Sequence, residues 1–213
     1  MTRAVVLISG SGSNLQAFID GVADDSLPID IKLVISNQAD AYGLTRAEKA
    51  NIETAHISHK DFAQRADFDK ALITAIDAAN ADIVILAGFM RILTADFVNH
   101  YANRLINIHP SLLPKYPGNN THQRVLDAKD TRHGASVHFV VPEVDAGPVI
   151  VQGHMPVRAD DSKDSLQRRI HEIEHQIYPK AVKWFASGRL SIEQGQVLLD
   201  GETSSKQLQS FDV

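Results

Sequence analysis

The alternation of short, strongly apolar runs with longer segments of helical periodicity constrains the fold of this chain more than any other feature. The first run, residues 4–9 (AVVLIS), leads into a glycine-rich turn and a helical pattern, and similar runs return at 31–36 and 83–87. Runs that are apolar throughout are typical of strands buried on both faces, and the helical segments between them can connect parallel strands. We therefore predict an α/β fold with a mostly parallel, twisted sheet that has helices on both faces.

Further elements continue this pattern up to residue 109. We expect a weak strand at 54–57 and a buried strand at 105–109, with helices at 42–50 and 62–79. The helical segments carry apolar residues at intervals of three and four, as is typical of helices that pack on a sheet.

The pattern changes after residue 109. Strand-like runs at 136–141 and 149–155 are separated only by PEVDAG, which is too short for a crossover helix. We therefore expect a hairpin or a long loop there, with an antiparallel strand near the C-terminal part of the sheet. Residues 165–186 have the apolar stripe of an amphipathic helix, which Pro179 must kink or divide because proline cannot donate to the preceding turn.

Length and composition favour one globular domain. The chain has 213 residues, of which 44% are hydrophobic and 22% charged, so it can form a continuous core and wholesale disorder is excluded. We predict a single domain over residues 1–190, followed by a C-terminal extension over 191–213 that is polar and mobile beyond Ser204.

Charge and residue content argue against several classes of protein. The net charge of −5 is unsuited to a general nucleic-acid binder, which needs a basic surface. Because cysteine is absent, disulfides, thiolate nucleophiles and cysteine-based metal sites are excluded. His133 and His138 do not have a metal-ligand spacing, so we expect no metal. The N-terminus does not look like a signal peptide and the apolar run 83–90 is too short to cross a bilayer, so we expect a cytoplasmic protein.

The turn after the first strand, GSGSN (10–14), lies where α/β folds bind phosphate groups. Glycines let the backbone approach an anion, and the N–H groups of the following helix point at it. A dinucleotide fingerprint needs a small residue where Leu15 stands, and the Lys-Ser/Thr pair of a P-loop is missing. The loop therefore fits a monophosphate better, while a tight turn capped by Ser13 or Asn14 is the purely structural alternative.

Three polar residues point to a catalytic centre at a strand end. Asn107 and His109 are two apart on the strand 105–109, hence on one face, and Pro110 ends that strand at the edge where open α/β folds bind ligands. Asn can polarise a carbonyl and His can transfer a proton near neutral pH. Asp145, in the loop between the two late strands, could approach His109, stabilise its protonated form and fix its tautomer. A histidine that only caps a strand end is the alternative.

Five segments occur in a characteristic order, namely GSGSN, AGFMRIL (87–93), NIHPSLLPKYPG (107–118), HGASVHFV (133–140) and DAGPVI (145–150). Together they resemble the phosphoribosylglycinamide formyltransferase family, the folate-dependent GAR transformylases. The likeness extends from about residue 3 to about residue 190. It implies the Rossmann-like formyltransferase fold and a cis peptide bond between Leu113 and Pro114.

The resemblance also implies an activity. A formyl group would pass from the co-substrate 10-formyltetrahydrofolate to the amine of glycinamide ribonucleotide (GAR), a step of purine biosynthesis. His109 would be the general acid and base, Asn107 the donor to the formyl oxygen, and Asp145 the group that favours protonated His109 and relays protons.

Binding residues for both substrates follow from the same resemblance. The GAR phosphate would lie on Gly12, Ser13 and Asn14. The GAR ribose would lie against His171, Glu172, Ile173 and Glu174, with the Glu174 carboxylate accepting from its hydroxyls. The formyl-folate would contact Arg65, Met90, Arg91, Ile92, Leu93, Asn107, Val141, Pro142, Glu143, Val144 and Asp145.

Other functions stay open from the sequence. A hydrolase of 10-formyltetrahydrofolate, or a folate-linked formyltransferase that acts on aminoacyl-tRNA, would share the central motifs. A nucleotide-binding sensor of the same fold would have no use for the Asn107, His109 and Asp145 set. The expected partners are the two small substrates and neither nucleic acid nor a membrane, while a homodimer stays open.

Overall fold

The computed structural model describes residues 1–203 and 208–213. The chain divides into two compact units, Met1–Asn107 and Ile108–Val213, and the boundary falls inside one strand. Among the described residues, every helix is too short or too polar to cross a membrane.

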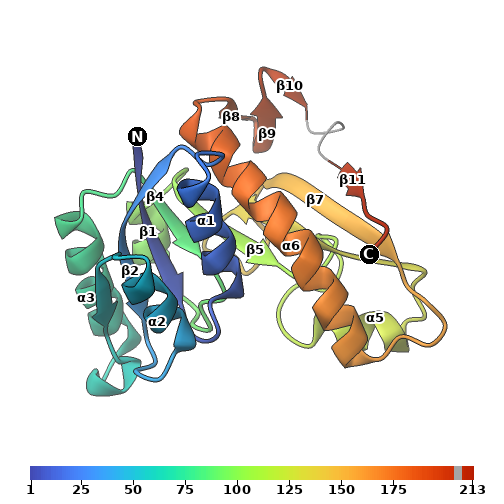
Figure 1. Ribbon diagram of the computed structural model, residues 1–213, viewed down its shortest axis with the longest axis horizontal. Coiled ribbons are helices and arrows are strands. Elements are labelled where there is room, and N and C mark those ends of the chain that lie inside the picture. Colours follow the sequence, from blue (N-terminus) through green and yellow to red (C-terminus); the bar gives the residue numbers. More distant parts are fainter. Residues whose placement is uncertain (204–207) are drawn as a thin grey trace. The chain divides into compact units, whose positions relative to one another are not determined.

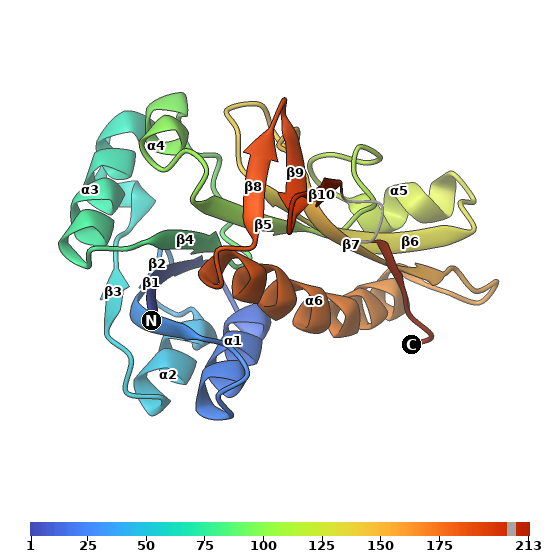
Figure 2. The ribbon, with the colours of Figure 1, turned by 90° about the horizontal axis from the view of Figure 1, so that it is seen from above.

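The first unit is a parallel sheet covered by helices. Its strands, in spatial order, are β5 (Leu105–His109, up to Asn107), β4 (Ile83–Leu86), β1 (Thr2–Ile8), β2 (Ile29–Ser36) and β3 (Thr54–His56). Its helices are α1 (Ser13–Ala23), α2 (Tyr42–Lys49), η1 (His59–Asp61, a 3-10 turn), α3 (Arg65–Ala78) and α4 (Ala95–His100). Figures 1 and 2 show α1 and α2 on one face of this sheet and α3 and α4 on the other. The predicted parallel strands and their order along the chain are confirmed.

Strand β1 lies at the centre of this sheet. It pairs with β2 on one side and with β4 on the other, so that Ala4 lies opposite both Ile31 and Ile83. All side chains from Ala4 to Ile8 are fully buried, as expected for a strand with helices on both faces. Because neighbouring strands are parallel, the carboxyl ends of β1, β2 and β4 lie at one edge, which is where α/β folds place their ligands.

The second unit combines a hairpin with a long helix. Strand β6 (Arg132–Phe139) pairs antiparallel with β7 (Val149–Pro156), as predicted for the two late strands. Helix α6 (Lys163–Ala186) packs on both strands (Figure 2). The short helix α5 (Thr121–Asp127) also contacts α6. A small antiparallel sheet follows, formed by β8 (Leu190–Glu193), β9 (Gln196–Leu199) and β10 (Glu202–Thr203).

Helix α6 begins at a strong cap and runs without a break. The Ser162 and Ser165 side chains each accept a hydrogen bond from the other residue's main-chain N–H, which closes a capping box. Pro179 lies inside the 24-residue helix and does not divide it. The stripe that includes Ile170, Ile173 and Ile177 is buried, in agreement with the sequence pattern.

The end of the chain adds a further strand. Residues 204–207, where the polar tail was expected to begin, lie outside the described part. Beyond them, β11 (Leu208–Ser210) pairs in parallel with β7. The main-chain oxygen of Val213 then accepts hydrogen bonds from Arg158 and Arg169 at 2.8 and 2.9 Å.

Candidate active site

The imidazole of His109 lies between two oxygen acceptors at the end of β5. Its side chain is buried, Nε2 lies 2.8 Å from the main-chain oxygen of Tyr116, and Nδ1 lies 3.3 Å from Oδ2 of Asp145. A neutral imidazole carries one N–H and can donate to only one of these oxygens. Only a doubly protonated ring could donate to both oxygens at once.

Asp145 reaches His109 from the loop after β6. Its backbone adopts a left-handed conformation with φ of 53°, and its Oδ2 also accepts a hydrogen bond from the Gly118 N–H at 2.7 Å. The carboxylate is nearly buried, at 11% side-chain exposure, where charge interactions are little screened by water. The structure therefore brings together the predicted His109 and Asp145 from segments that are far apart in the sequence.

A second histidine, which the sequence analysis did not assign to the site, lies on the other side of Asp145. His138 Nε2 is 3.8 Å from Asp145 Oδ1, and its Nδ1 lies 2.9 Å from the main-chain oxygen of Phe139. Burial lowers the pKa of His138, so the ring is neutral near pH 7 and donates its single proton to Phe139. His138 therefore presents an unprotonated Nε2 to Asp145.

Asn107 comes two residues before His109 on β5, where it lies opposite Leu86 of β4. Because side chains alternate along a strand, Asn107 and His109 share one face of β5. The predicted spacing of the amide and the imidazole is thus confirmed at the level of the strand.

The segment that supplies the Tyr116 carbonyl is fixed by a buried serine of β6. Ser136 Oγ accepts hydrogen bonds from the Leu113 N–H and from Gln152 Nε2 at 3.0 and 2.8 Å, and it donates to the Ser111 oxygen at 2.6 Å. The peptide bond between Leu113 and Pro114 is cis, as predicted. The path of the chain after His109 therefore depends on contacts with the hairpin.

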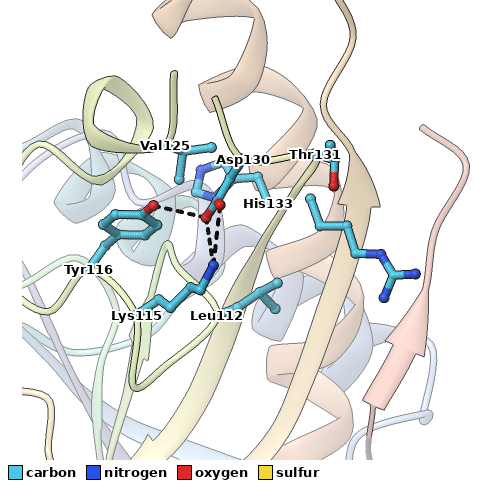
Figure 3. A pocket seen from close by; sticks show the side chains of 8 residues that line it. Leu112, Lys115, Tyr116, Val125, Asp130, Thr131 and His133 are labelled. Carbon is cyan, nitrogen blue, oxygen red and sulfur yellow. Dashed lines mark hydrogen bonds and ion pairs between the residues drawn. The ribbon is translucent and has the colours of Figure 1, made fainter. Parts of the chain in front are cut away.

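An ion-pair cluster beside this segment borders a cavity of about 370 Å³ (Figure 3). Asp130 accepts hydrogen bonds from Lys115 Nζ and Tyr116 Oη at 2.9 and 2.8 Å. Both bonds hold the pKa of Asp130 below its usual value. Arg124 lies over the Tyr116 ring and donates to the Pro117 oxygen at 2.6 Å, so the main chain that contacts His109 is held from several directions.

The glycine loop is packed tightly against α2. Gly12 has φ of 68°, and a Cβ atom there would lie 2.6 Å from the Cα of Gly43. The Gly43 N–H donates to the Gly10 oxygen at 3.0 Å, and Arg46 Nε donates to the Ser11 oxygen at 2.8 Å. Arg46, which the sequence analysis did not single out, therefore places a positive charge at the predicted phosphate loop.

The predicted ribose-binding segment lies in the first half of α6. Glu174 is 5% exposed, which is unusual for a carboxylate side chain. Burial raises the pKa of Tyr178 well above its usual value, and the charge of Glu174 adds to this effect. Ile173 is fully buried and Glu172 is exposed, so the four residues assigned to the ribose point in different directions.

The same segment contains a metal-binding pattern that the sequence analysis overlooked. His171 and His175 are four apart on α6, and HEIEH matches the His-Glu-x-x-His motif of zinc enzymes. Their imidazole rings are stacked, with ring centroids 6.3 Å apart. No set of three or more potential metal ligands meets anywhere in residues 1–203 and 208–213, so the motif lacks the third ligand that a zinc site needs.

The residues assigned to formyl-folate lie in both units. In the first unit, Met90 and Ile92 have exposed fractions of 73% and 59%, which is unusual for apolar side chains that directly follow a buried strand. Arg65 begins α3 in the same unit. In the second unit, Val144 is 53% exposed in the loop that carries Asp145.

Comparison with known proteins identifies the family. Residues 2–182 match the family described as "Formyl transferase". The chain belongs to the formyltransferase family. Phosphoribosylglycinamide formyltransferase of Escherichia coli K12 is 52% identical over 198 residues, which cover 93% of each chain. In Drosophila melanogaster, a trifunctional purine biosynthetic protein adenosine-3 is 49% identical over 87% of this chain and 14% of its own length.

A solved structure supports the same assignment. The phosphoribosylglycinamide formyltransferase of Coxiella burnetii, solved in complex with CHES, superimposes with a TM-score of 0.92 and 50% identity over 99% of both chains. This likeness along the whole chain confirms the predicted α/β formyltransferase fold. It also confirms the resemblance on which the residue assignments depend, while the individual binding roles stay predictions.

Proposed function

We propose that this formyltransferase moves the formyl group of 10-formyltetrahydrofolate to the amine of GAR, giving formyl-GAR and tetrahydrofolate in purine biosynthesis. The observation that carries this proposal is the pairing of buried His109 with Asp145 at 3.3 Å, at the end of the strand that also bears Asn107. The relatives named for this reaction support it.

The reaction begins when the free amine nitrogen of GAR attacks the formyl carbon. A new C–N bond forms, the carbonyl π electrons move to oxygen, and the tetrahedral intermediate carries an oxyanion. The Asn107 amide and the protonated His109 ring donate hydrogen bonds to that oxygen, where the developing negative charge is greatest. Their shared face on β5 suits this task.

Collapse of the intermediate requires two proton movements. Asp145 accepts one proton of the attacking amine through a water molecule, and the same water returns a proton to the folate nitrogen. The oxyanion then reforms the carbonyl as the bond from the formyl carbon to that nitrogen breaks, so that protons and charge balance. Every step uses groups of the chain or water.

The substrate can bind to His109 only if it replaces the present hydrogen-bond acceptor of the imidazole. Nε2 now contacts the Tyr116 oxygen at 2.8 Å, so the formyl oxygen must replace that carbonyl before His109 can donate to it. The Lys115 and Tyr116 bonds to Asp130 hold the carbonyl in place, so this cluster opposes the exchange.

The binding assignments complete the proposal. Gly12, Ser13 and Asn14 bind the GAR phosphate through main-chain N–H groups, with Arg46 nearby as a positive charge. Glu174, within the segment 171–174, binds the ribose hydroxyls. Formyl-folate lies against Met90–Leu93, Arg65 and the loop 141–145, where the exposed apolar side chains Met90, Ile92 and Val144 offer contact surface.

An assay with purified protein, GAR and 10-formyltetrahydrofolate tests this function directly. We expect absorbance changes of formyl-folate that depend on GAR, with formyl-GAR detected by mass spectrometry. Loss of formate from the folate without GAR would instead favour a hydrolase. Absence of nucleic-acid binding, a cytoplasmic location and the option of a homodimer stay predictions, and gel filtration with light scattering tests the last of these.

A further inference from the structure

A chain of hydrogen-bonded groups joins the carboxyl ends of three strands in the first unit. Ser9 follows β1, Asn37 follows β2, and Met90 lies after β4. Ser9 Oγ donates to Asn37 Oδ1 at 2.6 Å and accepts from the Met90 main-chain N–H at 2.7 Å. Asn37 Nδ2 lies 3.2 Å from His59 Nδ1. No step of formyl transfer uses Ser9, Asn37 or His59.

In this hydrogen-bonded network, the number of available protons determines which groups donate and which accept. The single hydroxyl proton of Ser9 goes to Asn37, which leaves a lone pair of Oγ for the Met90 N–H. Asn37 is 3% exposed, and with Oδ1 committed to Ser9 its Nδ2 donates to His59. Such a network is specific because every member needs its neighbours in place.

Few other contacts fix the backbone conformation of the segment after β4. Ala87 is bonded through its N–H to the Leu7 oxygen at 2.9 Å, and the Phe89 ring stacks on Phe68 with centroids 6.5 Å apart. At the far end, the Thr94 N–H donates to Asp69 Oδ2 at 2.6 Å.

Between these anchors the side chains contribute little packing. Met90 is 73% exposed and Ile92 is 59% exposed, so burial of apolar surface does not fix the main chain at these residues. The bond from the Met90 N–H to Ser9 is therefore the contact that sets the path of the backbone where the segment turns outward.

We propose that Ser9 and Asn37 are positioning residues for formyl-folate. They hold the main chain at Met90 so that the residues 90–93 form one preorganised surface for the co-substrate. Preorganisation increases affinity because less conformational entropy is lost on binding. The proposal rests on the assignment of formyl-folate to Met90–Leu93 in the proposed function.

The phosphate loop should not share this dependence, although Ser9 directly precedes it. That loop has anchors of its own in the Gly43 N–H and Arg46 Nε, which bond the oxygens of Gly10 and Ser11. Loss of the Ser9 hydroxyl therefore weakens the folate side and leaves the GAR side nearly unchanged.

The matched variants are Ser9→Ala, which removes the acceptor of the Met90 N–H, and Ser36→Ala as control. Ser36 is fully buried at the end of β2, and its hydroxyl bonds to the main chain of Gln38, so the control removes a similar buried hydroxyl that does not contact Ser9 or Met90. Ser9→Thr keeps the hydroxyl and should restore parental behaviour. If Ser9→Ala does not fold, Ser9→Cys, with its weak hydrogen-bonding sulfur, provides the same comparison.

Calorimetry with tetrahydrofolate, and separately with GAR, measures the two affinities. For Ser9→Ala we expect a tetrahydrofolate Kd about three- to tenfold higher, the effect of one net hydrogen bond, with a GAR Kd within about twofold of the parental value. The KM for formyl-folate should rise more than kcat falls. Unchanged tetrahydrofolate affinity in Ser9→Ala, or an equal loss in Ser36→Ala, would overturn the proposal.

Amide hydrogen exchange of Met90 in the ligand-free protein separates this proposal from the function on which it rests. Faster exchange in Ser9→Ala but not in Ser36→Ala supports the anchor, and equal exchange in all variants overturns it. If parental protein fails to bind tetrahydrofolate or to formylate GAR, the proposed function is what fails. In that case the positioning role for formyl-folate fails with it, even where the exchange of Met90 shows the anchor.

Discussion

Oδ2 of Asp145 lies 3.3 Å from Nδ1 of His109 and accepts the Gly118 N–H at 2.7 Å with the same atom. One carboxylate oxygen thus contacts the proposed acid–base histidine and fixes the segment that covers it. The histidine is held at its other nitrogen by the Tyr116 carbonyl from that same segment. Proton transfer and the position of the covering segment are therefore linked through Asp145.

The first prediction concerns this carboxylate. Asp145→Asn keeps the shape of the side chain and removes the charge that pairs with protonated His109, as well as the proton acceptor for the attacking amine. We expect kcat to fall by at least about 10²-fold, within the usual range for lost proton transfer, with tetrahydrofolate binding largely kept. Steady-state kinetics and calorimetry measure the two effects.

Asp127→Asn, on the exposed side of α5, is the matched control and should retain full activity. An Asp145→Asn enzyme with more than half of parental kcat across the pH range would show that Asp145 is structural, and another proton acceptor would have to be found.

The glycine loop gives the second prediction. Gly12→Val introduces a Cβ into a space where it would lie 2.6 Å from Gly43 Cα, at a residue with φ of 68°. The loop must shift away from α2, so we expect GAR binding to weaken by at least about tenfold while tetrahydrofolate affinity stays near normal. Calorimetry with each ligand checks this, after the melting temperature has confirmed that the variant is folded.

Gly10→Ala is the control for that loop, because a Cβ at Gly10 would meet no atom within 4 Å. It should bind GAR like the parental protein. Parental GAR affinity in Gly12→Val would remove the loop from the binding site.

The third prediction concerns Glu174, which is buried on α6. If its carboxylate accepts hydrogen bonds from the ribose hydroxyls, Glu174→Ala should raise the KM for GAR more than it lowers kcat. Charged hydrogen bonds of this kind are worth about 1.5–3 kcal/mol, or about one to two powers of ten in affinity. Glu172→Ala, at the exposed neighbouring position, should leave the KM for GAR unchanged, and equal KM values in both variants would argue against the ribose role.

The fourth prediction concerns a pair of neutral histidines in the second unit. His122 Nδ1 and His133 Nε2 lie 2.9 Å apart, and burial lowers their pKa values to about 4 and about 3. Because an unfolded histidine has a pKa near 6.5, the unfolded chain binds more protons as the pH falls below that value. The stability provided by the neutral pair is thus complete above about pH 6.5 and is lost progressively toward the folded pKa values.

His133→Gln keeps an amide nitrogen near the Nε2 position and does not titrate. Between pH 7 and pH 4.5, the melting temperature of this variant should fall less than that of the parental protein. The difference should be about 2–4 °C for each kcal/mol of pH-dependent stability that the substitution removes. His56→Gln, at an exposed position of β3, should follow the parental curve. Parallel curves for His133→Gln and the parental protein would contradict the role of the pair in acid sensitivity.

Several features of this formyltransferase could be predicted from the sequence because they depend on local periodicity. The buried strands, the helix Lys163–Ala186 and the shared face of Asn107 and His109 follow from spacings of two, three and four residues. The short helices Ala95–His100 and Thr121–Asp127 were missed, since six or seven residues carry too little helical pattern and are stable only through packing.

The tertiary structure alone determined the contacts between segments that are distant in the sequence. No periodic pattern in the sequence predicts the contact of the Tyr116 carbonyl with His109 or that of Asn37 with Ser9. The burial of Glu174 is likewise not predicted by such a pattern. Main-chain oxygens and N–H groups are present at nearly every residue, so no residue type marks the ones that bind a side chain. The sequence by itself determined which strand end carries Asn107 and His109, and the fold decided which oxygens and N–H groups contact them.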